Sequence, residues 1–293
     1  MSTTRFALPV VVILLVAACS ASAAPPSGSP TGSRAPSPSP TIAGIQHATG
    51  PGDVVLRMEQ GGGFVNPEFL LTNGPLFTLY GDGTIVFRDD RVAPPESTDG
   101  INRALPYKTA RLSEQQIQAL LESAITEGRL GVARALYDPG NIADAGSTTF
   151  TLDAGGVKKT VSVVALGMES WPGPDAPVVA SMAKLADRLR AFDENGTFPT
   201  QTYAPAGYRA LLWENAGGGA EPHAWPWPEL KATDFVAPAG DGPSFPRRVM
   251  TPADAAKLGI KGIEGGVMAF PIKAPDGKIY NFALRPLLPD EAG

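Results

Sequence analysis

Leu76-Phe77-Thr78-Leu79-Tyr80-Gly81-Asp82-Gly83-Thr84-Ile85-Val86-Phe87 is the stretch that best predicts the fold. Two short runs of apolar and β-branched residues flank Asp82-Gly83. An Asp-Gly dipeptide supplies the positive φ angles that tight hairpin turns require. We therefore expect an antiparallel β-hairpin here, preceded by a strand in the apolar run at 54–58.

A helix, a second hairpin and a second helix are predicted downstream. Ser113 and Gln116 form a capping-box pattern, and apolar residues then recur with helical spacing up to Gly128, a natural stop. A hairpin turns near residues 154–156, and a second amphipathic helix runs from about 176 to 192 with Asp175 as its N-cap. This order predicts an α+β fold in which antiparallel β-hairpins carry two amphipathic helices on one face.

Residues 89–110, between the first hairpin and the first helix, are polar and proline-bearing, which indicates a loop. The C-terminal third has a different pattern. Beyond residue 196 we expect a strand near 208–213, a short helix from Thr251 and a hairpin around Pro275-Asp276-Gly277. The predicted domains are a signal peptide at 1–18, a lipidated cysteine and disordered tether at 19–52, an α+β domain at 53–195, and a smaller β-rich C-terminal unit at 196–293.

The N-terminus predicts export. Arg5 precedes an apolar run at 6–18 that would form a helix about 20 Å long, shorter than the roughly 30 Å hydrocarbon core of a bilayer. The run ends in Val16-Ala17-Ala18-Cys19, which resembles the lipobox of bacterial lipoproteins. That resemblance implies lipidation of Cys19, the single cysteine, and an extracytoplasmic protein whose membrane partner is reached through the anchor. A plain signal peptide with a chance cysteine is the alternative.

Several motifs look like a group of uncharacterised bacterial envelope lipoproteins. The most specific are Tyr80-Gly81-Asp82-Gly83-Thr84 in the first hairpin and Arg285-Pro286-Leu287-Leu288-Pro289-Asp290-Glu291 at the C-terminus. The resemblance spans most of residues 53–291 and consists mainly of turn and packing elements. It implies a cell-envelope location and carries no activity to this chain.

Composition argues against two classes of ligand. The formal net charge is −5, with no basic stripe, so we expect no nucleic-acid partner. A zinc site needs several His, Cys, Asp or Glu ligands close together. Cys19 is expected to carry lipid, and His47 and His223 are the only histidines, so we expect no metal and no cofactor. Oxygen ligands cluster at 138–144, but without EF-hand spacing, and loop capping explains them more simply.

Catalytic motifs are weak. Ser181-Met182-Ala183-Lys184 matches the S-x-x-K pattern, but it falls inside a predicted helix and lacks the partner motifs of that enzyme class. A serine triad would need His223 as its base, because His47 is expected outside the fold. Paired carboxylates for glycoside hydrolysis stay open, since a sequence gives no geometry.

The Trp225-Pro226-Trp227-Pro228 segment is the candidate contact for an unknown envelope partner or ligand, because tryptophan is enriched at interaction sites. Packing of both rings within the C-terminal unit is the simpler alternative. The leading functional hypothesis is a non-enzymatic binding or structural module anchored by lipid outside the membrane. The alternatives are an extracytoplasmic hydrolase that uses carboxylates or His223, and a module that supports or inhibits another envelope protein.

Overall fold

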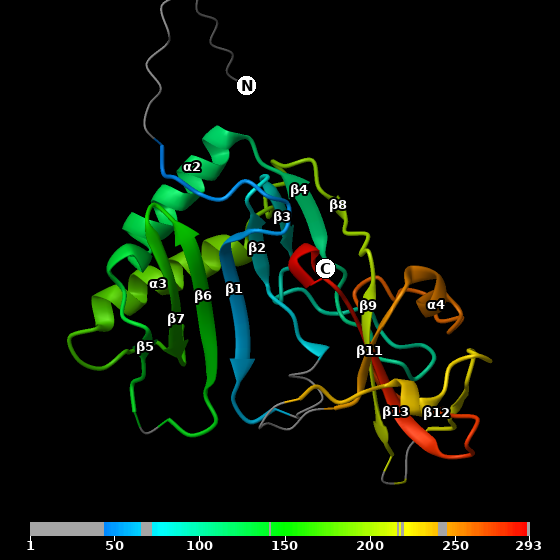
Figure 1. Ribbon diagram of the computed structural model, residues 1–293. Helices are drawn as coiled ribbons and strands as arrows, with labels where there is room; N and C mark the ends of the chain where they lie inside the picture. Colours follow the sequence, from blue (N-terminus) through cyan, green and yellow to red (C-terminus); the bar gives the residue numbers. More distant parts are fainter. Residues whose placement is uncertain are drawn as a thin grey trace, which may run out of the picture. The chain divides into compact units, whose positions relative to one another are not determined.

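The computed structural model describes residues 44–65, 72–140, 142–215, 217, 220–239 and 245–291. The predicted signal peptide, Cys19 and the tether up to residue 43 lie outside the described residues. Residues 44–293 form one compact unit that contains two β-sheets, as Figure 1 shows. The expected α+β class with mainly antiparallel strands is confirmed.

The first sheet has eight strands in the order β5-β7-β6-β1-β2-β3-β4-β8. Their bounds are β1 Val54–Gly62, β2 Phe77–Tyr80, β3 Thr84–Phe87, β4 Lys108–Arg111, β5 Leu136–Tyr137, β6 Gly146–Ala154, β7 Val157–Val164 and β8 Gln201–Thr202. The second sheet has the order β10-β12-β13-β9-β11. Its strands are β9 Tyr208–Glu214, β10 His223–Ala224, β11 Arg247–Met250, β12 Val267–Lys273 and β13 Ile279–Pro286.

The first predicted hairpin is confirmed as β2 and β3, paired from Phe77 with Phe87 to Leu79 with Ile85. Gly83 has a φ of 87°, the left-handed conformation that favours glycine in this turn. Asp82 stabilises the turn by accepting a 2.9 Å hydrogen bond from the Thr84 amide. The turn residues that were read from the sequence therefore determine the register at the centre of the sheet.

Two helices pack on one face of this sheet, as predicted (Figure 1). Helix α2, Glu114–Glu122, begins with the predicted capping box of Ser113 and Gln116 and continues as a wider turn over Ser123–Glu127 before it ends at Gly128. Helix α3 spans Ala176–Arg190. Asp175 occupies the N-cap position of α3, as predicted, but its side chain makes no capping hydrogen bond and pairs with Arg134 instead.

The second sheet has its own core, formed by alternate residues of β9, β12 and β13 and by the segments that cover them. Helix α4, Pro252–Ala256, is capped by Thr251 as expected, because the Thr251 hydroxyl accepts a 3.1 Å hydrogen bond from the Asp254 amide. The expected C-terminal hairpin is confirmed as β12 and β13.

Two segments are more ordered than the sequence indicated. The expected loop at 89–110 ends in strand β4 and contributes Ile101, 2% exposed, to the second core. Residues 44–52, assigned to the tether, contact the first sheet: His47 forms a β-bridge with Ala154, and the Gly155 amide donates to the Gln46 carbonyl at 2.7 Å. These backbone pairings satisfy groups at the end of the second hairpin, which local composition does not reveal.

Candidate functional site

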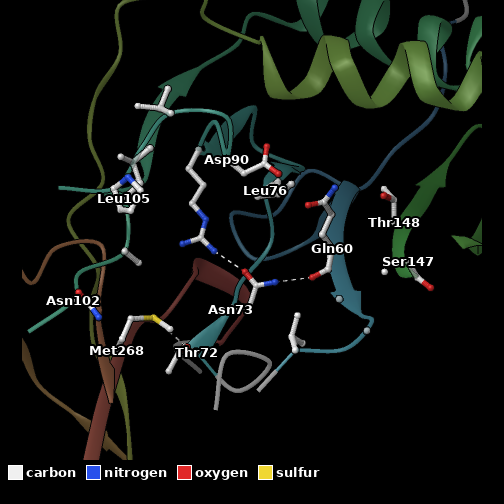
Figure 2. A pocket seen from close by; sticks show the side chains of 18 of the residues that line it. Gln60, Thr72, Asn73, Leu76, Asp90, Asn102, Leu105, Ser147, Thr148 and Met268 are labelled. Atoms are coloured by element: carbon white, nitrogen blue, oxygen red, sulfur yellow. Dashed lines mark hydrogen bonds between the residues drawn. The ribbon is translucent and has the colours of Figure 1, made fainter. Parts of the chain in front are cut away.

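A cleft of about 830 Å³ lies at one end of the first sheet (Figure 2). Because neighbouring strands are antiparallel, the ends of β1, β3 and β7 meet the starts of β2 and β6 at this edge. Residues 102–105 and Met268 of β12 form part of its wall. A volume of this size falls within the range of small-molecule binding sites.

Arg88 is one of the two arginines in the described cleft lining. Its Nη2 donates to Asn73 Oδ1 at 2.9 Å and to the Gly74 carbonyl at 3.3 Å, and its guanidinium carbon lies 4.7 Å from the centre of the Tyr107 ring. Asn73 in turn donates from Nδ2 to the backbone carbonyl of Gln60 at 2.6 Å; the two dashed bonds of Asn73 are drawn in Figure 2. Residues 73–74 and Tyr107 therefore orient the Arg88 side chain, and β1 in turn holds Asn73.

A second polar group joins the cleft to helix α3. Arg190 Nε lies 3.3 Å from Asp90 Oδ1. With the Gln60 amide oxygen facing Arg190, the amide nitrogen donates to Asp90 Oδ2 at 3.0 Å. Asp90 is the one carboxylate among the described lining residues, and a cation from α3 offsets its charge.

Other polar side chains of the lining have no partner in the described chain. They are the Asn102 amide and the hydroxyls of Ser147 and Thr148. Apolar side chains separate them, among them Leu76 and Leu105 (Figure 2). A lining with a few unpaired polar groups in an apolar wall is typical of sites that bind small ligands.

Charged residues connect the C-terminal end of the described chain to β1. Arg57 and Tyr80 both donate to Asp290 Oδ1, at 2.6 and 2.7 Å. Arg285 pairs with Glu291. A Cβ at Gly74 would come within 2.3 Å of the Tyr107 hydroxyl and 3.9 Å of Arg285 Nη1. We call Arg57, Tyr80 and Asp290 the C-terminal clamp.

Burial and charge shift the pKa values of carboxyl groups in and beside the clamp in opposite directions. Burial would raise the pKa of Asp290, but the hydrogen bonds from Arg57 and Tyr80 hold it below its ordinary value. Burial raises the pKa of Glu59, against the attraction of Arg57, and the negative charge of Asp290 adds to the rise. The clamp thus favours the charged form of Asp290, whereas burial disfavours the charged form of Glu59.

The structure buries Trp227 and partly buries Trp225, the two residues of the predicted partner contact. Trp227 is 3% exposed, and its indole Nε1 donates to the Asp254 carbonyl at 2.8 Å. Trp225 is partly buried, stands edge-on to Trp227 with ring centroids 5.1 Å apart, and donates to the Leu230 carbonyl at 2.8 Å. Both rings belong to the second core, so partner binding through Trp227 has no exposed surface to use. The Trp-Pro-Trp-Pro segment therefore packs within the C-terminal unit, which is the simpler alternative considered for it.

The other candidate residues are not assembled into a catalytic site. His223 is exposed and packs edge-on against Phe270. The Ser181 hydroxyl donates within its own helix to the Pro177 carbonyl at 3.2 Å. The expectation that His47 lies outside the fold is wrong, because its Nε2 lies 3.3 Å from Glu114 Oε1.

The loop considered for calcium is stabilised by its own side chains. Asp138 Oδ1 accepts a 2.8 Å hydrogen bond from the Gly140 amide, which is the loop-capping role considered as the alternative. Within the described residues, no three His, Cys, Asp or Glu side chains come together as a metal-binding group would.

Comparisons add no relative to this description: no family model, curated protein or solved structure matches the chain. None of the helices in the described ranges combines the length and apolar character that crossing a membrane requires. The resemblance to envelope lipoproteins therefore stays a prediction.

No sequence motif points to the residues that line the cleft. Gln60, Asn73 and Arg88 lie at strand ends whose proximity depends on the order of strands in the sheet. The one local signal was Gly61-Gly62-Gly63 directly after an apolar strand, which marks an irregular strand end.

Proposed function

We propose that this chain is a lipid-anchored extracytoplasmic protein of the bacterial cell envelope whose folded part binds a small ligand in the cleft. The anchor rests on the lipobox-like sequence ending at Cys19. The binding role rests on one observation: a cleft of about 830 Å³ whose polar lining groups include several with no partner in the described chain. Such polar groups can exchange their hydrogen bonds with water for bonds with a ligand, and the apolar wall is buried in the same step.

The alternative hydrolase has less support. Glycoside hydrolysis needs two carboxyl groups that flank the substrate, whereas Asp90 is the one carboxylate of the described lining and is held by Arg190. His223 is not among the described lining residues. Acyl transfer would need a nucleophile and a base within hydrogen-bond reach of each other. The hydroxyls of Ser147 and Thr148 in the cleft have no such partner among the described residues.

Binding can be tested by purifying the protein from its native envelope and recording native mass spectra for a retained small molecule. Ser147→Tyr would place a ring in the cleft, and Ser162→Tyr is the matched control on the same face of the neighbouring strand β7. We expect a retained mass in the wild type and in Ser162→Tyr that is lost in Ser147→Tyr. A small molecule retained equally by all three proteins would contradict binding in the cleft. A retained molecule that is hydrolysed to smaller products during incubation would favour the hydrolase.

The anchor is tested separately. Cys19→Ser should move the protein from the detergent phase to the aqueous phase, or leave it unprocessed, because no other cysteine can be lipidated. Wild-type protein that stays in the aqueous phase would contradict the anchor and leave the binding proposal intact.

A further inference from the structure

We infer that the cleft selects a small amphipathic ligand with a single carboxylate, and that Arg88 is the residue that binds this carboxylate. The inference rests on the proposed binding role of the cleft and adds the chemical class of the ligand.

The first argument is the unbalanced charge of Arg88. Of the two arginines in the described lining, Arg103 is fully engaged: it forms two hydrogen bonds with Asp99, at 2.9 and 2.7 Å, and donates from Nε to the Lys261 carbonyl at 2.6 Å. Arg88 makes no ion pair within the described residues, and its Nε and Nη1 make no hydrogen bond there. A guanidinium with free donors is suited to a carboxylate, which can accept two parallel hydrogen bonds.

The second argument is that Arg88 is already oriented. One nitrogen is held by Asn73 and Gly74, and the guanidinium carbon lies over the Tyr107 ring, 4.7 Å from its centre. These contacts use neutral partners, so they fix the geometry without neutralising the charge. Little side-chain entropy is then lost when an anion binds, which favours affinity.

The third argument concerns the number of charges on the ligand. Asp90 lines the same cleft, and although Arg190 offsets its charge, it disfavours a second negative charge nearby. A group with one negative charge therefore fits better than a doubly charged phosphate.

The remaining wall indicates an apolar body. Leu76, Leu105 and Met268 line the cleft, and Val92, 52% exposed, belongs to the same lining. Such exposed apolar groups beside a cleft are typical of a surface that meets an apolar ligand.

Calorimetric titrations of the full chain carrying Cys19→Ser, in buffer without detergent, can test this inference. The probes are hexanoate, hexanamide, hexylamine and hexyl phosphate, which share one apolar body and differ in head group. We expect hexanoate to bind at least tenfold more tightly than hexanamide and hexylamine, and no more weakly than hexyl phosphate. This comparison needs no substitution in the cleft, so it does not depend on the folding of a variant.

Substitutions then assign the preference to Arg88. Arg88→Gln should lower the affinity for hexanoate at least tenfold, to the level of hexanamide, and Arg88→Lys should retain part of the preference because it keeps the charge. Arg134→Gln is the matched control, since Arg134 also lies 4.7 Å from a tyrosine ring centre but pairs with Asp175 outside the cleft. It should leave all four affinities unchanged.

Each other result overturns the inference in a recognisable way. Equal affinity for hexanoate and hexanamide, lost in Ser147→Tyr, would keep the binding cleft and reject the carboxylate. A preference for hexylamine would make Asp90 the anchor, and a preference for hexyl phosphate would indicate a doubly charged ligand. If no probe binds, the carboxylate inference fails, while the proposed function is still judged by the molecule retained in native mass spectra.

Discussion

Arg57 and Asp290 are separated by 233 positions in the chain, yet Arg57 Nη2 donates to Asp290 Oδ1 at 2.6 Å. Their side chains are only 15% and 19% exposed. Removing the carboxylate by Asp290→Ala leaves a largely buried guanidinium without its partner. We expect a loss of about 1.5–3 kcal/mol in the free energy of unfolding, the usual range for hydrogen bonds to charged groups.

Urea unfolding at pH 7 measures this loss. Asp153→Ala is the control, because Asp153 pairs with Lys158 in a pair whose side chains are 44% and 84% exposed. Exposed pairs of this kind contribute about 0–1 kcal/mol. Equal losses in the two variants would show that the C-terminal clamp does not stabilise the fold.

Glu59 gives a pH-dependent prediction of the opposite sign. Burial raises its pKa in the folded state, so its contribution to stability is present below the unfolded pKa of about 4.3 and is lost as the pH rises through the folded value. Glu59→Gln removes a charge that burial disfavours. The variant should therefore unfold at a higher urea concentration than the wild type at pH 7, and this gain should disappear near pH 4.

Asp290→Asn provides the comparison for that titration. The pKa of Asp290 is lowered in the folded protein, so its contribution is present above about pH 4 and is lost as the pH falls further. The difference between the wild type and Asp290→Asn should shrink in acid. Parallel pH profiles for Glu59→Gln and Asp290→Asn would contradict the assignment of the two shifts.

Local chemistry explains which parts of the fold could be predicted. The Asp82-Gly83 turn, the Ser113 capping box and the Pro252 helix start each depend on residues only a few positions apart, and each is present. Asp175 occupies the N-cap position of α3, but its carboxylate pairs with Arg134 of another segment and bonds no helix amide. Residue spacing predicts which neighbouring groups can bond a helix end, but it does not predict that a residue from another segment will bind the same side chain.

The cleft depends on distant segments, so its residues could not be ranked from the sequence. The hairpin turn fixes the pairing of Phe77 with Phe87 and so brings Arg88 close to Leu76. The contact of Asn73 with Gln60, by contrast, follows only once β1 is known to pair with β2. The place of residues 102–105 in the cleft wall could not be predicted either, because this segment of an expected loop pairs with β12 of the other sheet.

Gly265 provides a test of that wall. A Cβ at this position would lie 2.1 Å from the Ala104 carbonyl oxygen, and residues 102–105 hold to β12 through the 2.8 Å bond from the Met268 amide to the Asn102 carbonyl. Gly265→Ala should therefore push this segment outward and destabilise the fold by about 1–3 kcal/mol, as overpacking does. Hydrogen exchange at the Met268 amide should accelerate more than exchange at the Leu79 amide, which lies in the first sheet.

Gly52→Ala is the matched control for this substitution, because the nearest atom to its Cβ would be 3.9 Å away, an ordinary contact distance. Its unfolding free energy should change by less than about 0.5 kcal/mol, as for surface positions without special contacts. An unchanged exchange rate at Met268 in Gly265→Ala would mean that the wall can move without loss, and that the cleft is less well defined than its hydrogen bonds indicate.

Trp225 and Trp227 should differ in their contribution to stability although one proline separates them. Trp227 is 3% exposed, and its ring lies 5.4 Å from that of Phe282 at the centre of the second core. Trp227→Ala should cost about 3–5 kcal/mol, the usual range for a large aromatic replaced by alanine in a core. Trp225 is only partly buried, so less of its contact area is lost in Trp225→Ala, and we expect a cost of about 1–3 kcal/mol.

Thermal melts of the two variants measure both values, with Trp227→Phe as the control that keeps an aromatic ring but loses the hydrogen bond to the Asp254 carbonyl. Melts of Trp225→Ala and Trp227→Ala that match the wild type would reject this structural role and return the segment to consideration as a partner-binding surface.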